Sequence, residues 1–260
     1  MALLLTGHPR SGTQLLQRIC DRHPDVELTN EFGCFRALGT TRTHYAIGIL
    51  GRMWARRRAP IVQEPSGDGR GRFLRSYRLE GRFLWHMLRE GPPLVDATAV
   101  EDGLRRLFLD ARLVGDKLPD YVSNLDGLAC CPNLRPIVMY RDARDVVASY
   151  LDRLRNGWDR MPIFREFDTP EKIARRWISA IEAMRRHGSR VLCVRYEDLV
   201  QAPDYEVERI AEWTDLPKDG FDTSIVRPGT IGRYRERLTA KEIATVTRVA
   251  GSTLESLGYM

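Results

Sequence analysis

Short apolar runs alternate along the chain with longer segments in which apolar residues recur at every third or fourth position. The short runs, at residues 2–6, 113–115, 135–140 and 191–195, have the length of buried strands. The longer segments have the periodicity of helices that bury one face. This alternation predicts an α/β fold of three layers, in which a parallel sheet is flanked by helices.

Three of the longer segments carry clear helix signals. Residues 13–22 follow the first predicted strand directly. A second helix begins with Thr169 as its N-cap and Pro170 at its first position, and it ends before Gly188. A third opens on Thr239 and Glu242, at the spacing of a capping box. The apolar stripes of these helices predict core packing and no chemistry.

Composition places the chain among ordinary globular proteins. It has 260 residues, 43% hydrophobic and 29% charged, which suits a single domain over residues 1–260 and excludes a largely disordered chain. No apolar run approaches the roughly 20 residues of a spanning helix, and the first residues lack a signal-peptide pattern. We therefore expect a cytoplasmic protein without integral membrane association. The five cysteines include no C-x-x-C pair, which predicts free thiols rather than disulfides or a zinc site.

Positive charge is concentrated in one segment. Residues 51–82 contain nine arginines and three acidic residues, which accounts for the whole net charge of +6. Such a patch indicates an anionic partner, although solvated surface arginines have the same pattern. We interpret residues 40–90 as an arginine-rich insert that binds an acidic acceptor or forms a lid. Residues 63–71 and the aromatic segment 156–168 are predicted loops that close over a substrate.

A glycine-containing turn joins the first predicted strand to the first helix, with the sequence Gly7-His-Pro-Arg-Ser-Gly-Thr13. Such a turn directs backbone N–H groups and a helix N-terminus at one point, which suits a phosphate. Thr13 stands where nucleoside triphosphatases have their lysine, so ATP or GTP hydrolysis is disfavoured. A strand–turn–helix with incidental polar residues is the structural alternative. The candidate ligands are Arg10, Ser11, Gly12, Thr13 and Gln14.

A second candidate anion site begins where the predicted strand 135–140 ends. Arg141 lies at the carboxyl end of that strand, where ligands bind in open α/β sheets. Asp142 can cap the next helix, and Ser149 and Arg153 share one face of it. Together with Arg141 they can bind an anionic group through charge-assisted hydrogen bonds, although a salt-bridged helix start has the same pattern.

Two phosphate-binding segments on one sheet, without the triphosphatase lysine, resemble the sulfotransferases that use 3′-phosphoadenosine 5′-phosphosulfate (PAPS). The resemblance implies a P-loop-like fold, with the first loop on the 5′-phosphosulfate and Arg141, Ser149 and Arg153 on the 3′-phosphate. Three further segments match in order, up to about residue 235. They place Lys117 near the sulfuryl group, and Tyr196 and Arg233 near the nucleotide.

The resemblance also implies the reaction, a sulfuryl transfer from PAPS to a hydroxyl acceptor that releases 3′-phosphoadenosine 5′-phosphate (PAP). We expect no metal, because positioned cations and amides can stabilise this transfer. Lys117 and Arg10 are the expected electrophilic partners. The Golgi-type spacing implies Glu31 as general base, 21 residues after Arg10. Cytosolic members use a histidine, for which this chain offers His44 and His86.

Two other functions fit parts of the pattern. A nucleotide or metabolite kinase with an altered phosphate loop would require magnesium and bind ATP. A nucleotide-sensing or RNA-binding module would show steep salt dependence without turnover, but no RNA-binding signature accompanies the arginines, so we expect no nucleic acid partner. The resemblance does not separate tyrosyl peptides, carbohydrates, lipids and small natural products as acceptors.

Overall fold

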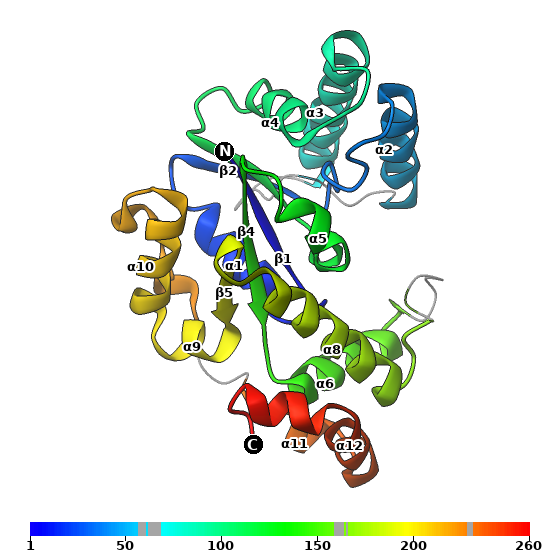
Figure 1. Ribbon diagram of the computed structural model, residues 1–260, viewed down its shortest axis with the longest axis vertical. Helices are drawn as coiled ribbons and strands as arrows, with labels where there is room; N and C mark the ends of the chain where they lie inside the picture. Colours follow the sequence, from blue (N-terminus) through cyan, green and yellow to red (C-terminus); the bar gives the residue numbers. More distant parts are fainter. Residues whose placement is uncertain (57–60, 62–68, 159–163, 165, 228–230) are drawn as a thin grey trace.

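A five-stranded parallel sheet forms the centre of the protein in the computed structural model, which describes residues 1–56, 61, 69–158, 164, 166–227 and 231–260 (Figure 1). The strand order is β2-β3-β1-β4-β5. The predicted α/β class is therefore confirmed. The strands are β1 (Ala2–Gly7), β2 (Val26–Asn30), β3 (Leu113–Lys117), β4 (Leu134–Tyr140) and β5 (Leu192–Arg195).

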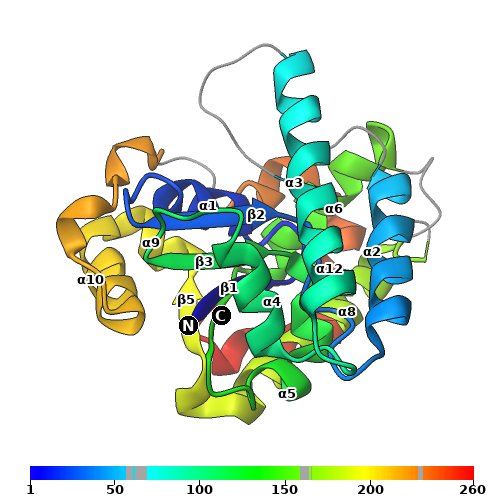
Figure 2. The same cartoon turned by 90° about the horizontal axis from the view of Figure 1, so that it is seen from above.

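One face of the sheet is covered by α1 (Thr13–Cys20), α9 (Tyr196–Gln201) and α10 (Pro203–Thr214). Leu3 and Leu5 of β1 point into this layer. Because side chains alternate along a strand, Leu4 faces the opposite layer, which holds the remaining long helices (Figure 2). The three-layer arrangement is thus as predicted.

The opposite layer has two hydrophobic clusters. The first packs β1 against α2 (Arg42–Arg56), α3 (Gly69–Glu90) and α4 (Ala97–Arg105). The second is built from α6 (Ala143–Arg155), α8 (Pro170–His187) and α12 (Ala240–Ser256). Shorter elements complete the described chain: η1 (Pro119–Asn124), α5 (Leu125–Leu128), η3 (Gly188–Arg190), η4 (Lys218–Gly220), η5 (Thr223–Ile225) and α11 (Tyr234–Arg237).

The predicted insert at residues 40–90 contains two neighbouring helices, α2 and α3, which share a hydrophobic core with the sheet (Figures 1 and 2). The sequence predicts a loop at residues 63–71. This prediction is wrong for residues 69–71, which form the start of α3, and residues 63–68 lie outside the described part of the chain. In the predicted loop at residues 156–168, residues 159–163 and 165 also lie outside the described part of the chain. Within the rest, the rings of Trp158 and Phe164 stack with centroids 4.2 Å apart.

Three local predictions are confirmed. The Thr169 side chain caps α8 by accepting a hydrogen bond from the Lys172 N–H, and Thr239 and Glu242 form the capping box of α12. All five cysteines are free. Across the part of the chain that the structure describes, we find no helix with the length and apolarity needed to span a membrane.

Candidate active site

The glycine-containing turn between β1 and α1 adopts a left-handed backbone at two positions. Gly12 has φ = 100° and Arg10 has φ = 77°, an unusual value for a residue with a side chain. Backbones of this kind persist where the surrounding structure enforces them, and they cluster at ligand-binding sites. The Ser11 hydroxyl is buried in the turn and has no hydrogen-bond partner among the described residues. A bound anion would supply the missing acceptor.

Gly12 is also required by the close approach of Tyr196, at the start of α9. A Cβ atom at Gly12 would lie 2.3 Å from Cδ2 of the tyrosine ring, far inside van der Waals contact. The tyrosine thus packs directly on the turn. This contact brings the glycine-containing turn and the segment around Tyr196 together in the predicted nucleotide site.

Replacing Gly12 with alanine is expected to destabilise the fold by about 2–4 kcal/mol, because backbone strain adds to the overlap with Tyr196. Gly157→Ala is the matched control, since Gly157 has φ = 113° but open space around its Cα. Gly157→Ala should lower the free energy of unfolding only by the backbone strain, about 1–2 kcal/mol. Chemical denaturation measures both values, and equal losses would contradict the role of the tyrosine contact.

A cavity of about 390 Å³ lies beside the turn. Its lining contains five arginines and a single acidic residue, so the cavity is strongly electropositive. Ser11 and Arg153 do not line it. The lining brings together most of the nucleotide-binding residues expected from the sequence, namely Arg10, Gly12, Thr13, Gln14, Arg141, Ser149, Tyr196 and Arg233.

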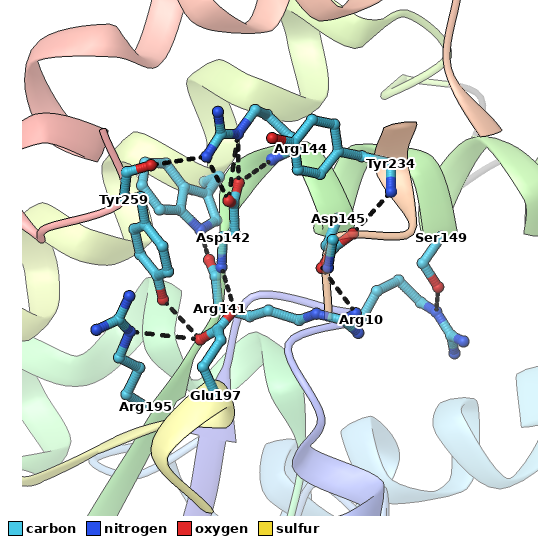
Figure 3. Close-up of polar contacts among 12 residues, drawn as sticks. Arg10, Arg141, Asp142, Arg144, Asp145, Ser149, Arg195, Glu197, Tyr234 and Tyr259 are labelled. Atoms are coloured by element: carbon cyan, nitrogen blue, oxygen red, sulfur yellow. Dashed lines mark hydrogen bonds and ion pairs between the residues drawn. The ribbon is translucent and has the colours of Figure 1, made fainter. Parts of the chain in front are cut away.

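Arg10 connects the turn to α6. Its Nε donates to the Ser149 hydroxyl at 3.0 Å (Figure 3). Its guanidinium lies 5.7 Å from the centre of the Trp158 ring. Burial lowers the pKa of Arg10, and the charges of Arg153 and Arg141 lower it further. Arg153 therefore contributes its positive field without lining the cavity. These cations repel one another, and an anion bound between them would relieve that repulsion.

The lining also holds three charged residues that were not predicted for the site: Arg18, Arg237 and Asp145. Arg18 follows Gln14 by one turn of α1, so helical spacing was a signal that could have found it. Asp145 is buried, and its carboxylate accepts hydrogen bonds from Arg141 Nη2 at 3.1 Å and from the Gly232 N–H at 2.8 Å (Figure 3). This aspartate ties the Arg233 loop to Arg141.

A second buried carboxylate, Glu197, joins the start of α9 to the segment Tyr140–Tyr150. Its Oε1 accepts the Asp142 N–H at 3.1 Å, and its Oε2 accepts the Tyr259 hydroxyl at 2.9 Å (Figure 3). Burial raises the pKa of Glu197. The guanidinium of Arg141 lies 4.3 Å from the centre of the Tyr196 ring. The ends of β4 and β5 are therefore fixed relative to each other.

The expected catalytic pair meets at the ends of β2 and β3. Glu31 follows β2, Lys117 ends β3, and Lys117 Nζ donates to Glu31 Oε1 at 2.8 Å. The Gln14 side chain of α1 lies 3.4 Å from the same nitrogen. The lysine side chain is 1% exposed and the glutamate side chain 49%, so the carboxylate reaches solvent while the ammonium does not. Glu31 has φ = 56°.

The two histidines considered as alternative bases, His44 and His86, lie on other elements. His44 is exposed on α2, and His86 of α3 lies 3.2 Å from Glu90. His8 is buried within the turn, where burial lowers its pKa to about 3. Among the described residues, no group of three or more His, Cys, Asp or Glu side chains could hold a metal ion.

Two curated relatives of this chain are named as protein-tyrosine sulfotransferases. A putative protein-tyrosine sulfotransferase of Caenorhabditis briggsae is 24% identical over 220 residues, which are 82% of this chain and 65% of that protein. Protein-tyrosine sulfotransferase A of Caenorhabditis elegans is 25% identical over 225 residues, 84% of this chain and 50% of that one. The chain thus spans between half and two thirds of these relatives.

Two solved structures have a similar fold. The sulfotransferase domain of the Synechococcus PCC 7002 olefin synthase aligns over 97% of this chain and 94% of that one, with a TM-score of 0.58 and 18% identity. Sulfotransferase STF9 of Mycobacterium avium aligns over 100% of this chain and 77% of that one, with a TM-score of 0.53 and 15% identity. A family model described as "Sulfotransferase family" matches residues 3–220, so the chain belongs to the sulfotransferase family.

Proposed function

We propose that this protein transfers a sulfuryl group from PAPS to a hydroxyl acceptor and releases PAP. The observation that carries the proposal is the cavity beside the turn, where five arginines and only one carboxylate meet. A nucleotide with phosphate groups at both its 5′ and 3′ positions matches this charge. The orphaned Ser11 hydroxyl offers an unused donor in the turn.

The two ends of the nucleotide are assigned to different elements. Arg10 and Ser11 with Gly12, Thr13 and Gln14 would hold the 5′-phosphosulfate, because they form the turn and the first residues of α1. The 3′-phosphate would be held by Arg141, Ser149 and Arg153, with Arg233 closing the site and Tyr196 flanking the nucleotide.

Three residues are proposed to act on the transferring group. PAPS supplies the sulfuryl group and a phosphate leaving group. Lys117 and Arg10 would donate hydrogen bonds to the oxygens on which negative charge grows. Glu31 would accept the acceptor's hydroxyl proton as the oxygen–sulfur bond forms and the bond to the phosphate breaks. The half-exposed position of the Glu31 carboxylate leaves it open to an incoming hydroxyl.

A tyrosyl hydroxyl is the first acceptor to test, because both Caenorhabditis relatives are named as protein-tyrosine sulfotransferases. We further propose that residues 1–260 act as one sulfotransferase domain with an acceptor-binding insert at residues 40–90. Within the insert, Arg75, Arg78 and Arg82 are exposed on α3, which suits an acidic acceptor.

The donor assignment is tested by comparing PAP with AMP, which differ only in the 3′-phosphate. PAP should bind about 10- to 100-fold more tightly, since a charge-assisted hydrogen bond contributes about 1.5–3 kcal/mol. Isothermal titration calorimetry measures both dissociation constants. In Arg141→Met the preference for PAP should shrink, whereas in Arg185→Met, an exposed residue of α8, it should persist. Equal affinities for PAP and AMP in the unaltered protein would refute the proposed 3′-phosphate site.

A further inference from the structure

The turn that carries Glu31 is held by two successive residues of β3, Asp116 and Lys117. Their side chains point to opposite faces of the sheet, because orientation alternates along a strand. Lys117 pairs with the Glu31 carboxylate, and its carbonyl oxygen accepts the Glu31 N–H at 2.7 Å. Asp116, from the other face, accepts the N–H groups of the next two residues. The proposed base is therefore fixed from both sides.

Asp116 has a complete set of hydrogen-bond donors around a fully buried side chain. Its Oδ1 lies 2.7 Å from the Thr29 hydroxyl and 3.2 Å from the Phe32 N–H. Its Oδ2 accepts from the Gly33 N–H at 2.7 Å and the Tyr121 hydroxyl at 2.6 Å. Burial raises the pKa of Asp116, and the hydrogen bonds from these donors oppose that rise. The ionised carboxylate, which only accepts hydrogen bonds, matches all of them. An asparagine would present an NH₂ group to one pair of these donors.

The backbone of Glu31 needs such support. Its φ of 56° lies in the left-handed region, which residues with a side chain adopt only where neighbouring contacts enforce it. The turn is held by the Lys117 carbonyl before it, by the Asp116 carboxylate after it, and by Arg52, whose Nε donates to the Phe32 carbonyl at 3.2 Å. Loss of the Asp116 bonds would allow the backbone to relax and move the Glu31 side chain.

We propose that Asp116 is a positioning residue, which sets the location of the Glu31 carboxylate without touching the substrate. This inference rests on the proposed function, in which Glu31 is the general base. Displacing a catalytic group by about 1 Å typically lowers the rate by about 10²-fold. Asp116 lies outside the lining of the nucleotide cavity, so we expect its replacement to slow the chemical step and to leave nucleotide binding intact.

The test is Asp116→Asn in the full chain, assayed by label transfer from radiolabelled PAPS to a tyrosine-containing peptide or to 4-nitrophenol. We expect kcat to fall by about 10- to 100-fold, while the KM for PAPS and the Kd for PAP stay unchanged. In a Glu31→Gln background the same substitution should cause no further loss, because the group it positions is already gone. A structural role alone would give the same fold-loss in both backgrounds.

Tyr121→Phe is the control, since it removes one donor from the same carboxylate, together with the acceptor of the Phe35 N–H, and leaves both N–H bonds of the turn. Its kcat should stay close to that of the unaltered protein. If Asp116→Asn does not fold, Asp116→Glu keeps the charge but shifts the oxygens by one methylene, and the same loss of kcat is expected. Unchanged kcat in the folded variant, or equal losses with and without Glu31, overturns the proposal.

The two proposals fail in different ways. A protein that binds no PAP and transfers no label refutes the proposed function, whatever Asp116 does. An active protein that Glu31→Gln inactivates, but in which Asp116→Asn acts independently of Glu31, retains the proposed function and refutes only the role of Asp116.

Discussion

Glu31→Gln is expected to lower the turnover of the proposed sulfuryl transfer by about 10²–10⁴-fold, the usual contribution of a positioned general base. The amide keeps the shape of the side chain, and its oxygen can still accept the Lys117 hydrogen bond that Glu31 accepts at 2.8 Å. It cannot take a proton from the acceptor. The loss should therefore appear in kcat, with PAP binding nearly unchanged.

The measurement is single-turnover transfer from radiolabelled PAPS, paired with calorimetry of PAP binding. Glu27→Gln is the control, because Glu27 lies on strand β2, which directly precedes Glu31, and the substitution makes the same change in charge. Its turnover should match that of the unaltered protein. A general electrostatic effect on the anionic donor would alter both variants alike.

One result would move the base to another residue. If Glu31→Gln keeps near-normal turnover while His44→Ala or His86→Ala abolishes it, the base is a histidine. The structure places both histidines on the α2–α3 pair, and His86 already has Glu90 as a partner at 3.2 Å. Glu31, in contrast, contacts the lysine that the resemblance assigns to the sulfuryl group.

The central strands could be predicted from the sequence, but the edge strand β2 could not. Strands β1 and β4 contain uninterrupted apolar runs at residues 2–5 and 136–139, which are buried. Strand β2, at the end of the strand order, has the sequence Val-Glu-Leu-Thr-Asn, in which polar residues interrupt the apolar ones. Its strand conformation depends on pairing with β3, a contact between residues more than 80 positions apart.

The start of α3 was mistaken for a loop because glycine has a low helix propensity. Gly69 and Gly71 lie in its first turn, yet the helix continues to Glu90 and buries Phe83 and Met87 against the sheet. Tertiary packing of this apolar face outweighs the local preference of the glycines. The stabilisation from this packing depends on residues far apart in the sequence, so it cannot be predicted from a window of a few residues.

Within the candidate site, the residues that the sequence points to are those whose spacing is local. The turn from Arg10 to Gln14 and the helix from Arg141 to Ser149 each lie within a few residues, so their spacing is readable. The aspartate that ties Arg141 to the Arg233 loop was missed, because Asp145 bonds an N–H group 87 residues away. A contact of that kind follows only from the completed fold.

Lys117→Met is expected to lower kcat by about 10²–10³-fold, because it removes a donor placed where negative charge grows in the transition state. Its effect on stability should differ from that of Glu31→Gln. The lysine side chain is 1% exposed, and methionine has a similar shape without the desolvation cost of a buried ammonium. The remaining carboxylate, 49% exposed, is solvated by water. The free energy of unfolding should therefore be unchanged or higher.

Glu31→Gln leaves the buried ammonium without its counter-charge, which should reduce the free energy of unfolding by about 1–3 kcal/mol. Chemical denaturation of Lys117→Met and Glu31→Gln measures the two changes in the free energy of unfolding, which should differ in sign or in size. Lys172→Met is the control for a lysine-to-methionine change, because Lys172 forms an exposed ion pair with Asp168. A Lys117→Met variant as unstable as Glu31→Gln would show that the lysine stabilises the fold by more than its desolvation costs. Unchanged kcat in that variant would remove Lys117 from the reaction, since no donor at the sulfuryl group can be lost without slowing the transfer.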